Sequence, residues 1–449
     1  MKQYPHYKDS GVEWLGEVPA HWKLNKLKVF TSFCGGGTPS RDNPNYWGGD
    51  IPWVSPKDMK SERITDAEEC ITSTGLASSS TSMIPAGQVL MVVRSGILKH
   101  TIPVAINDVP VALNQDMKSM RFEPESCTSA FFFRWVSGLN DSLLLAWAKQ
   151  GATVESIEHS YLAETLAALP PLSEQTAIAV FLDRETAKID TLIAAQHRLI
   201  DLLKEKRQAL ISYAVTKGLD PDAPMKDSGV EWLGEVPEGW NVKAIKWISP
   251  VQRGASPRPI DDPRYFDDDG EYAWVRIADV SSSDGVLLET TQRLSDLGNS
   301  LSVKLEPGQL FVSIAGTVGK PCITAIKACI HDGFVYFPHL PINPKFLFRL
   351  FEAGTCYAGL GKMGTQLNLN TDTIGAIRIA LPPPKELREV LTFLDLETAR
   401  IDSLIAAAEK AITLAQERRS ALISAAVTGK IDVRGLLPSH LDANALETS

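Results

Sequence analysis

The stretch KDSGVEWLGEVP, residues 8–19, occurs again without change at residues 226–237. A tryptophan follows each copy at the same spacing, as Trp22 and Trp240. Twelve identical residues in one chain indicate an internal duplication, and a repeat of this period decides how the whole fold is interpreted. Because each copy carries a Trp and a Leu beside a Gly, we interpret it as a packing clip at the edge of a folded domain.

The duplication extends along the chain with its order preserved, and the spacing drifts by a few residues, as expected when surface loops change length. The matching segments are GGTPS (36–40) with GASPR (254–258), IPWVSPKDM (51–59) with YAWVRIADV (272–280), PAGQVLMVV (85–93) with EPGQLFVSI (306–314), and LPPLSEQTAIAVFLD (169–183) with LPPPKELREVLTFLD (381–395). The chain therefore has the plan globular domain, helix, globular domain, helix.

The globular domains are typical of mixed α/β structure. Short apolar runs between Gly and Pro residues predict strands at 27–34, 51–54, 88–93 and 102–107. Residues 129–149 predict one amphipathic helix, whose counterpart is 344–360.

The segments after each LPP motif predict long helices. From Leu172 to Thr216 there is no Gly or Pro, and apolar residues including Leu182, Ile189, Leu192 and Leu199 follow a 3–4 alternation. Each helix has about 40 residues and a length of about 60 Å. The two helices are expected to pair antiparallel, because a globular domain lies between them in sequence.

We therefore predict an α+β fold with two similar mixed α/β domains separated by two long helices that form an antiparallel coiled coil, with pseudo-twofold symmetry. The expected boundaries are 1–171 for the first domain, 172–217 for the first helix, 218–383 for the second domain, 384–430 for the second helix and 431–449 for a tail.

Composition limits the class of protein. With 449 residues, 44% hydrophobic and 22% charged, the chain is typical of a globular protein with a sizeable core. The first residues lack a signal-peptide pattern, and the most apolar stretch is interrupted by Arg134 and Asp141, so no membrane partner is expected. Six cysteines without a C-x-x-C pair favour a reducing, cytoplasmic location and argue against a zinc site.

The two domains share a framework but differ in their loops, which predicts two different ligand surfaces. Duplex DNA with two half-sites about one helical turn apart suits such an object. Arg and Lys can read guanine edges, and Asn and Gln can read adenine. The candidate DNA-binding residues are Ser40, Arg41, Lys57, Arg94, Lys99, Asn114, Gln115 and Lys118 in the first domain, and Arg253, Arg258, Arg264, Arg276, Lys320, Lys362, Gln366 and Asn368 in the second.

The alternation of variable domains with repeated helices resembles the DNA-specificity subunit of Type I restriction-modification systems. The resemblance is carried by GVEWLGEVPAHW, GGTPS, IPWVSPKDM and LPPLSEQTAIAVFLD, each with its second copy, and covers the chain to about residue 430. It implies that each domain is a target recognition domain reading half of an asymmetric bipartite site. It also implies that the helices set the spacer and dock two methyltransferase subunits, and that restriction (translocase) subunits join this core.

The resemblance also implies that the catalytic activities, which are N6-adenine methylation and DNA cleavage, reside in partner chains. No cofactor is expected here, whereas S-adenosylmethionine, ATP and Mg²⁺ are expected in the partners. The net charge of −9 argues against a nucleic-acid partner. Basic loops and cations supplied by partner subunits would resolve that conflict.

No motif predicts an enzyme. Asn43-Pro44-Asn45-Tyr46 and Asp262-Pro263-Arg264-Tyr265 lack the second Pro of a methyltransferase [DN]-P-P-[YF] turn, and GTVGKP (316–321) lacks essential residues of a phosphate loop. Two alternatives remain open: a two-lobed protein-binding scaffold without DNA recognition, and a self-contained enzyme.

Apolar positions outside the helix pair are candidates for partner binding. Ile193, Ile200 and Ile405 are expected to face helices of a partner, with packing in the core as the alternative. Inserting four residues near Gln196 adds about one helical turn, and we expect it to lengthen the spacer between half-sites.

Overall fold

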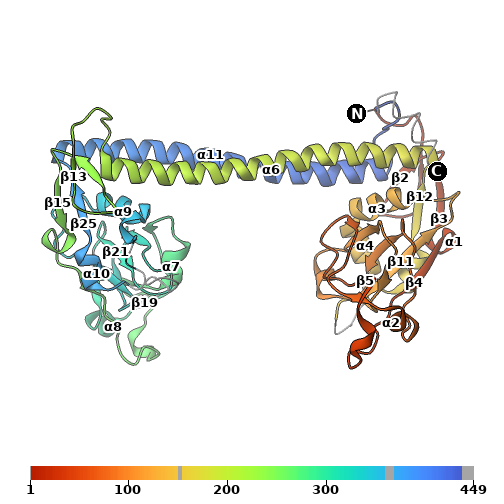
Figure 1. The fold of residues 1–449 in the computed structure, drawn as a ribbon, viewed down its shortest axis with the longest axis horizontal. Coiled ribbons are helices and arrows are strands. Elements are labelled where there is room, and N and C mark those ends of the chain that lie inside the picture. Colours follow the sequence, from red (N-terminus) through yellow and green to blue (C-terminus); the bar gives the residue numbers. More distant parts are fainter. Residues whose placement is uncertain (1, 150–153, 359, 361–368, 437–449) are drawn as a thin grey trace. The chain divides into compact units, whose positions relative to one another are not determined.

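The computed structural model describes residues 2–149, 154–358, 360 and 369–436, and its elements are labelled in Figure 1. These residues form two compact units. Unit 1 takes its described residues from 2–196 and 410–436, and unit 2 consists of the described residues of 197–409. Each unit therefore combines one globular domain with part of both long helices.

Unit 1 has two sheets. The five-stranded sheet has the order β4 (Thr31–Gly35), β11 (Met117–Phe122), β8 (Val89–Val92), β9 (Val104–Asn107) and β6 (Arg63–Ile64). The three-stranded sheet has the order β10 (Ala112–Leu113), β5 (Trp47–Val54) and β7 (Cys70–Ile71). Strands β6 and β9 pair parallel, as do β5 and β10, whereas the other neighbours are antiparallel.

Unit 2 repeats this topology with one strand added to its second sheet. Its five-stranded sheet has the order β16 (Gln252–Arg253), β24 (Phe334–Tyr336), β21 (Leu310–Ser313), β22 (Pro321–Thr324) and β18 (Val286–Leu287). Its second sheet has the order β19 (Arg293–Leu294), β17 (Tyr272–Val275), β23 (Ala328–Ile330) and β20 (Val303–Leu305). The parallel pairs β18–β22 and β17–β23 occupy the places of β6–β9 and β5–β10. The duplication inferred from sequence is thus a duplication of fold.

Smaller elements complete each unit. In unit 1 they are β1 (Tyr7–Asp9), β2 (Glu17–Pro19), β3 (Lys23–Lys26), β12 (Leu166–Leu169), α1 (Leu27–Phe30), α2 (Ser73–Ala77), α3 (Ser129–Gly138), α4 (Asn140–Trp147) and α5 (His159–Glu164). In unit 2 they are β13 (Met225–Asp227), β14 (Glu235–Pro237), β15 (Asn241–Ala244), β25 (Arg378–Leu381), α7 (Ile277–Ser282), α8 (Asp296–Ser300), α9 (Pro344–Ala353) and α10 (Thr371–Ala376). Short 3-10 helices include those at Pro44–Tyr46 and Pro263–Tyr265.

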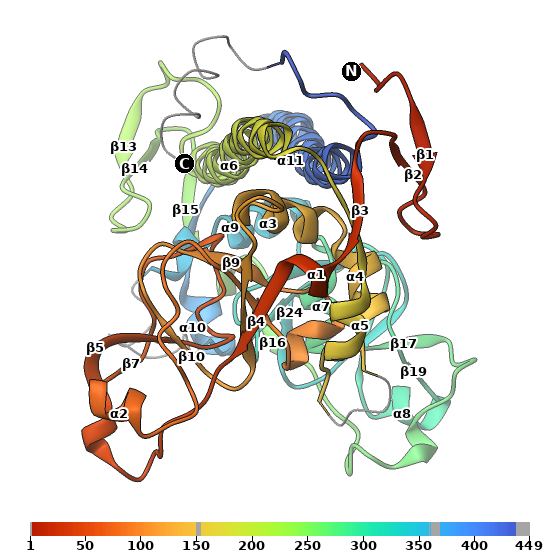
Figure 2. The same cartoon turned by 90° about the vertical axis from the view of Figure 1, so that its right-hand side faces the viewer.

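The repeated stretch forms a β-hairpin in each unit, β1–β2 and β13–β14. Its Leu15 and Val18 are buried, at no more than 2% exposure, and Val12 and Trp14 are half-buried, while Trp22 just after it is fully buried. In unit 1 the hairpin leads into β3, which pairs with β12 and joins the globular domain to the long helices (Figure 2). The interpretation of this stretch as a packing clip is confirmed.

The long helices are α6 (Leu172–Lys217) and α11 (Pro384–Val427). The two helices run in opposite directions within each unit (Figure 1), and an ion pair joins them in each: Arg419 Nε lies 2.9 Å from Asp190 Oδ1 in unit 1, and Arg207 Nε lies 2.9 Å from Asp402 Oδ1 in unit 2. Both units bury side chains of both helices, for example Leu182 and Ile423 in the core of unit 1. The predicted fold class is confirmed.

The predicted apolar stripe was only partly right. The less exposed positions of α6 run Leu182, Thr186, Ile189, Ile193, Gln196, Ile200, Leu203, Arg207, Leu210 and Ala214, which is a continuous 3–4 alternation. Polar residues occupy several of these seam positions, and this hid the register in the sequence. Leu192 and Leu199, assigned to the stripe, are 48% and 44% exposed.

Two local predictions were wrong. Residues 27–34 are a helical turn followed by a strand, because one turn sends Leu27 and Phe30, three residues apart, into the same core, whereas a strand would send them to opposite faces. Residues 129–149 form two helices. Gly138 packs against Ile423 of α11, and the side chain of Asn140 bonds to the backbone of Ile102, which redirects the chain.

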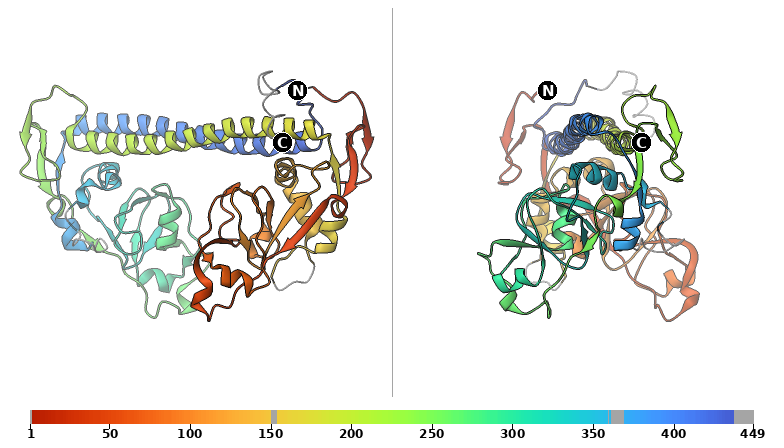
Figure 3. Two further views of the ribbon diagram at one scale, coloured as in Figure 1. Left: turned by 45° about the vertical axis from the view of Figure 1, so that its right-hand side comes forward. Right: turned by 90° about the vertical axis from the view of Figure 1, so that its left-hand side faces the viewer.

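The counterpart of that helix, α9, ends at Ala353 because Gly354 adopts a left-handed conformation with φ of 71°. In each unit this helix, α3 or α9, lies between the long helices and the five-stranded sheet (Figures 1 and 3). No helix in the described part of the chain is long and apolar enough to cross a bilayer.

Candidate nucleic-acid interface

In unit 1 the loops with the candidate DNA-binding residues converge on one edge of the two sheets. Lys118, at the start of β11, is in register with Gly35 at the end of β4 and with Met91 near the end of β8. The backbone N–H of Asn114, after β10, donates to Val54 O at the end of β5, at 3.0 Å. The loops that follow β4, β5, β8 and β10 therefore meet at this edge, called here edge 1.

Several candidates at edge 1 are already engaged within the unit. Arg41 stacks on the Trp47 ring, 3.8 Å from its centroid, and pairs with Glu69, with Nη2 2.9 Å from Oε2. The bond from Arg41 lowers the pKa of the Glu69 carboxyl and so keeps it charged. Arg94 Nε lies 2.6 Å from Asp116 Oδ1. These two arginines are held in fixed orientations and partly neutralised.

Other candidates are available to a ligand. Lys57 and Lys99 are exposed, and their ammonium groups have no hydrogen bond or ion pair to any described residue. The Ser40 side chain is exposed as well. Lys118 is half-buried, and burial lowers the pKa of its ammonium group. Asn114 is 6% exposed, and its side chain accepts from Asp116 N, so it shapes the turn instead of facing solvent.

Unit 2 presents the equivalent edge, called edge 2, where β16, β17, β21 and β23 end. Its centre is Asp332. The Asp332 carboxylate accepts from Ser256 Oγ at 2.9 Å and pairs with Arg258 Nη2 at 2.9 Å. Arg253 Nε donates to the Asp332 backbone carbonyl. The candidates Arg253 and Arg258 are thus brought together around a carboxylate that the sequence did not single out.

The remaining candidates of unit 2 lie elsewhere or are occupied. Arg264 is exposed and pairs with Asp262 two residues earlier, with Nη2 2.6 Å from Oδ2. Arg276 donates to Thr291 Oγ1 and lies next to Asp279. Lys320 is discussed with its pocket below. Lys362, Gln366 and Asn368 lie outside the described residues.

Edges 1 and 2 share one contact but differ in its chemistry. In unit 1 the hydroxyl of Thr38 bonds to the side-chain amide of Gln115, and in unit 2 that of Ser256 bonds to the carboxylate of Asp332. Although burial alone would raise the pKa of Asp332, the bond from Ser256 and the charge of Arg258 lower it. The same position therefore offers a neutral donor and acceptor in unit 1 and an anion beside two arginines in unit 2.

Each globular domain is anchored to its helices by a comparable ion-pair network. In unit 1, Arg134 of α3 bonds to Asp183 of α6 and to Glu62, and Arg419 of α11 also reaches Glu62, at 3.0 Å. The Arg134 side chain is 7% exposed, so its charge depends on these partners.

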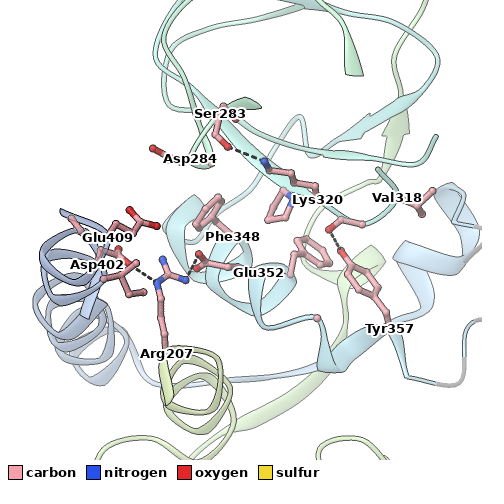
Figure 4. Close-up of a pocket in the computed structure, with 17 residues that line it drawn as sticks. Arg207, Ser283, Asp284, Val318, Lys320, Phe348, Glu352, Tyr357, Asp402 and Glu409 are labelled. Atoms are coloured by element: carbon pink, nitrogen blue, oxygen red, sulfur yellow. Dashed lines mark hydrogen bonds and ion pairs between the residues drawn. The ribbon is translucent and has the colours of Figure 1, made fainter. Parts of the chain in front are cut away.

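In unit 2 the equivalent arginines are Arg349 and Arg207, and they share the carboxylate of Glu352 of α9. Arg207 Nη1 lies 2.9 Å from Glu352 Oε1, and Arg349 Nη1 lies 2.8 Å from Glu352 Oε2. Figure 4 shows Arg207 between Glu352 and Asp402. The central carboxylate thus comes from a loop in unit 1 and from a helix in unit 2. Divergent domains are fastened to the helices by equivalent arginines.

A cavity of about 860 Å³ lies beside this network in unit 2, lined by α9, α11 and the loops at 283–285 and 318–321 (Figure 4). Lys320 lines it and donates to the carbonyls of Ser281 and Ser283 at 2.9 and 2.8 Å. Tyr357 donates to Gly319 O at 2.9 Å. The Lys320 ammonium group is therefore used to hold a loop at edge 2 in place.

The isoleucines predicted to face a partner belong to the helix seam. Ile200 is 6% exposed, and Ile193 and Ile405 are half-buried. The helices leave large apolar side chains accessible at other positions, among them Leu192, Leu202, Leu404 and Leu414, each between 48% and 55% exposed. Leu192 and Leu202 align with Leu404 and Leu414 in the repeat. That partners bind at Ile193, Ile200 and Ile405 stays a prediction.

The motifs weighed as enzymatic have structural uses. Asn43 and Asp262 cap short 3-10 helices by accepting from the backbone N–H of the second residue after them. Among the described residues, no group of three or more His, Cys, Asp or Glu side chains could hold a metal ion. Burial raises the pKa of the thiols of Cys322 and Cys356, to about 11 and about 12.

Comparison with known families agrees with this arrangement. A family model described as the Type I restriction modification DNA specificity domain matches residues 19–200 and 237–413. The two matches correspond to the two copies of the repeat and together cover most of the chain.

Similar proteins carry related names. The chain is 34% identical over 207 residues to the specificity subunit of the Escherichia coli Type I restriction enzyme EcoR124I/EcoR124II. The matched residues make up 46% of this chain and 50% of that protein. It is 28% identical over 300 residues to the MjaIX specificity subunit of Methanocaldococcus jannaschii, covering 65% of this chain and 64% of that one. The MjaVIII specificity subunit of the same organism matches over 93% of this chain and 95% of its own length, at 22% identity.

Two solved structures share the fold. One is a chain from a study of complex assembly and conformational transition of the type I R-M system, with a TM-score of 0.73, 18% identity, and coverage of 92% of this chain and 99% of that chain. The other is the HsdS subunit from Thermoanaerobacter tengcongensis, with a TM-score of 0.56, 16% identity, and coverage of 92% and 98%. The chain therefore belongs to the family of Type I restriction-modification DNA specificity proteins, with one specificity domain in each copy of its repeat.

Proposed function

We propose that this chain is the DNA-reading subunit of a Type I restriction-modification complex. Each unit reads one half of an asymmetric bipartite sequence in duplex DNA through edge 1 or edge 2. The matched relatives are named as specificity subunits of such enzymes.

The observation that carries this proposal is the pair of equivalent contacts with different chemistry. Thr38–Gln115 and Ser256–Asp332 occupy the same place at the two edges. An amide presents one donor and one acceptor to a base edge, whereas a carboxylate flanked by arginines presents an acceptor between donors. One scaffold with two hydrogen-bonding patterns suits a target whose halves differ in sequence.

The electrostatics of edge 1 fit this role despite the acidic chain. Arg41 and Arg94 are neutralised by Glu69 and Asp116 in the free protein, while Lys57 and Lys99 stay available to phosphates. Phosphate contacts position a protein on DNA, and base contacts specify the sequence. We expect weak, salt-sensitive binding by the isolated chain and stronger binding once partners add cations.

We further propose that two methyltransferase subunits dock on the helix pair and that restriction (translocase) subunits join them in the cytoplasm. S-adenosylmethionine, ATP and Mg²⁺ are assigned to those subunits, and this chain contributes no catalysis. The half-exposed leucines of α6 and α11 support a docking role, because repeated apolar side chains on a helix surface are typical of binding sites.

A domain exchange tests the proposal. Residues 27–165 lie between the paired strands β3 and β12, so another family member's equivalent segment can replace them, provided that it keeps the residues at positions 62 and 134 that bond to the helices. In a complex with the methyltransferase partner, the exchange is expected to change one half of the methylated sequence, detected by single-molecule sequencing of genomic DNA. If both halves changed, independent reading would be refuted. A complex without any sequence preference would favour the scaffold alternative.

A further inference from the structure

The two clips differ at one buried point. In unit 1 the Trp22 indole Nε1 donates to Glu174 Oε1 at 3.0 Å, and the Tyr4 hydroxyl donates to the same oxygen at 2.5 Å. The Tyr4 ring is 3% exposed and packs edge-on against Trp22, with ring centroids 6.1 Å apart. The Arg434 guanidinium lies over the Tyr4 ring, 4.8 Å from its centroid. A tyrosine under a cation therefore completes this clip.

Unit 2 has the same frame without that tyrosine. Trp240 is fully buried and aligns with Trp22, and Glu386, at the start of α11, aligns with Glu174. The positions of Tyr4 and His21, however, hold Asp222 and Gly239. Neither supplies a ring, so the space that two aromatic side chains occupy in unit 1 has no equivalent filling in unit 2.

The result is a cavity of about 430 Å³, whose lining includes Leu219, Ala223, Gly239, Trp240 and Glu386. The Trp240 Nε1 atom is buried and has no hydrogen-bond partner among the described residues. The Glu386 carboxylate is likewise without a hydrogen bond or ion pair within the part of the chain that the structure describes. A buried indole N–H without an acceptor is costly and points to a missing occupant.

The charged residues that line the cavity indicate what kind of chemical group can occupy it. Its lining includes the carboxylates of Asp220, Glu238, Glu386 and Glu389 and one ammonium group, that of Lys385. This excess of negative charge favours a cation, the role that Arg434 plays above Tyr4 in unit 1. An aromatic ring alone would leave the carboxylates uncompensated, and a cation alone would leave the apolar walls unfilled.

We propose that the Trp240 cavity is a docking site for a tyrosine side chain next to an arginine or lysine in a partner polypeptide. The ring takes the place that Tyr4 has in unit 1, its hydroxyl donates to Glu386, and the basic neighbour lies among the carboxylates. Glu386, once oriented by this bond, also accepts from Trp240 Nε1, as Glu174 accepts from Trp22.

The direct test uses a dipeptide probe, N-acetyl-Tyr-Arg-amide, and the full chain. Binding is followed through the Trp240 indole N–H resonance, assigned by its loss in Trp240→Phe. We expect saturable binding with a downfield shift of this resonance, and roughly tenfold weaker binding of N-acetyl-Phe-Arg-amide, because the bond to the carboxylate is lost. Absence of saturable binding, or equal affinity for both probes, would overturn the proposal.

The matched variant is Asp222→Tyr, which restores in unit 2 the residue found at position 4. Asp222 does not line the cavity, but its neighbour Ala223 does, so the larger tyrosine side chain is expected to reach into the cavity, to raise the midpoint of thermal unfolding and to abolish binding of the probe. A variant that is stabilised but still binds the probe as the wild type does would show that the probe binds elsewhere. Glu386→Gln, which keeps the shape of the side chain, should weaken binding roughly tenfold.

A second measurement identifies the source of the tyrosine and rests on the proposed function, because it uses the complex with methyltransferase and restriction subunits. The photo-crosslinker p-benzoylphenylalanine replaces Leu219, which lines the cavity and is 37% exposed. The expected crosslink is to a partner peptide with Tyr beside Arg or Lys. Crosslinks to residues 437–449 of this chain, or to peptides without Tyr, would refute a partner polypeptide as the occupant. The dipeptide result stands or falls independently of DNA recognition.

Discussion

Replacement of Asp332 by asparagine separates the two roles assigned to edge 2. In the free protein Asp332 neutralises Arg258 through one ion pair of 2.9 Å. Asp332→Asn frees one cation, and each additional phosphate contact steepens the slope of log affinity against log salt by about 0.9. A fourfold rise in salt, from 50 to 200 mM, should therefore weaken DNA binding by an additional factor of about 3.5.

Specificity should change in the same variant, because the carboxylate orients Arg258 and is itself an acceptor. We expect discrimination at one base pair to fall by about 1–3 kcal/mol, in the half-site read by unit 2 alone. Fluorescence anisotropy of the complex with its methyltransferase partner, on duplexes with single substitutions, measures both effects. The matched control is Gln115→Glu, which places a carboxylate at the equivalent position of unit 1 and should flatten the salt dependence. Changed preference in the half read by unit 1 upon Asp332→Asn would refute the reasoning.

Three further predictions concern stability, docking and the helices. Tyr4→Phe removes a buried hydrogen bond to Glu174 and should destabilise unit 1 by about 1.5–3 kcal/mol. The measurement is amide hydrogen exchange at the start of α6, which should become faster. The control is Tyr213→Phe, at a residue that is 53% exposed, which should have no effect. Leu192→Lys combined with Leu404→Lys should lower co-purification with the methyltransferase partner without loss of helical circular dichroism. The contrasting variant Ile200→Lys should lower the helical signal itself. Normal assembly of the double variant would exclude these leucines as the docking site. Inserting seven residues after both Gln196 and Glu409 preserves the seam and the ion pairs within each unit and lengthens each helix by about 10 Å. The spacer in the methylated sequence should therefore grow by about three base pairs. An unchanged spacer would contradict a measuring role for the helices.

Much of the fold was predictable because duplication gives every element two chances to be recognised. Leu15, Val18 and Trp22 recur as Leu233, Val236 and Trp240, and both sets are buried. The long helices followed from the absence of Gly and Pro over 45 residues, 172–216. The seam was harder to assign, because Thr186, Gln196 and Arg207 occupy positions that a heptad pattern reserves for apolar residues.

The site was less predictable, because the availability of a side chain depends on its partners. Arg41 and Lys57 are equally plausible in sequence, yet one is stacked on Trp47 and paired with Glu69 while the other is unpaired within the described residues. Asp332 was not among the predicted residues, which were chosen mainly as Arg, Lys, Asn and Gln side chains able to read base edges. The alignment of Ser256 with Thr38 points to Asp332 as the counterpart of Gln115 only after the fold has shown that the loops carrying these residues meet.

The discontinuity of unit 1 has a consequence for biosynthesis. Its core includes Ile423, Ala426 and Val427, and the backbone N–H of Asp432 donates to Lys2 O at 2.8 Å, whereas unit 2 is drawn from a continuous stretch of chain. During translation the ribosome therefore releases all of unit 2 before it makes residues that unit 1 needs. The first domain synthesised is the last to be completed, and until then its open apolar surface is a substrate for chaperones and proteases.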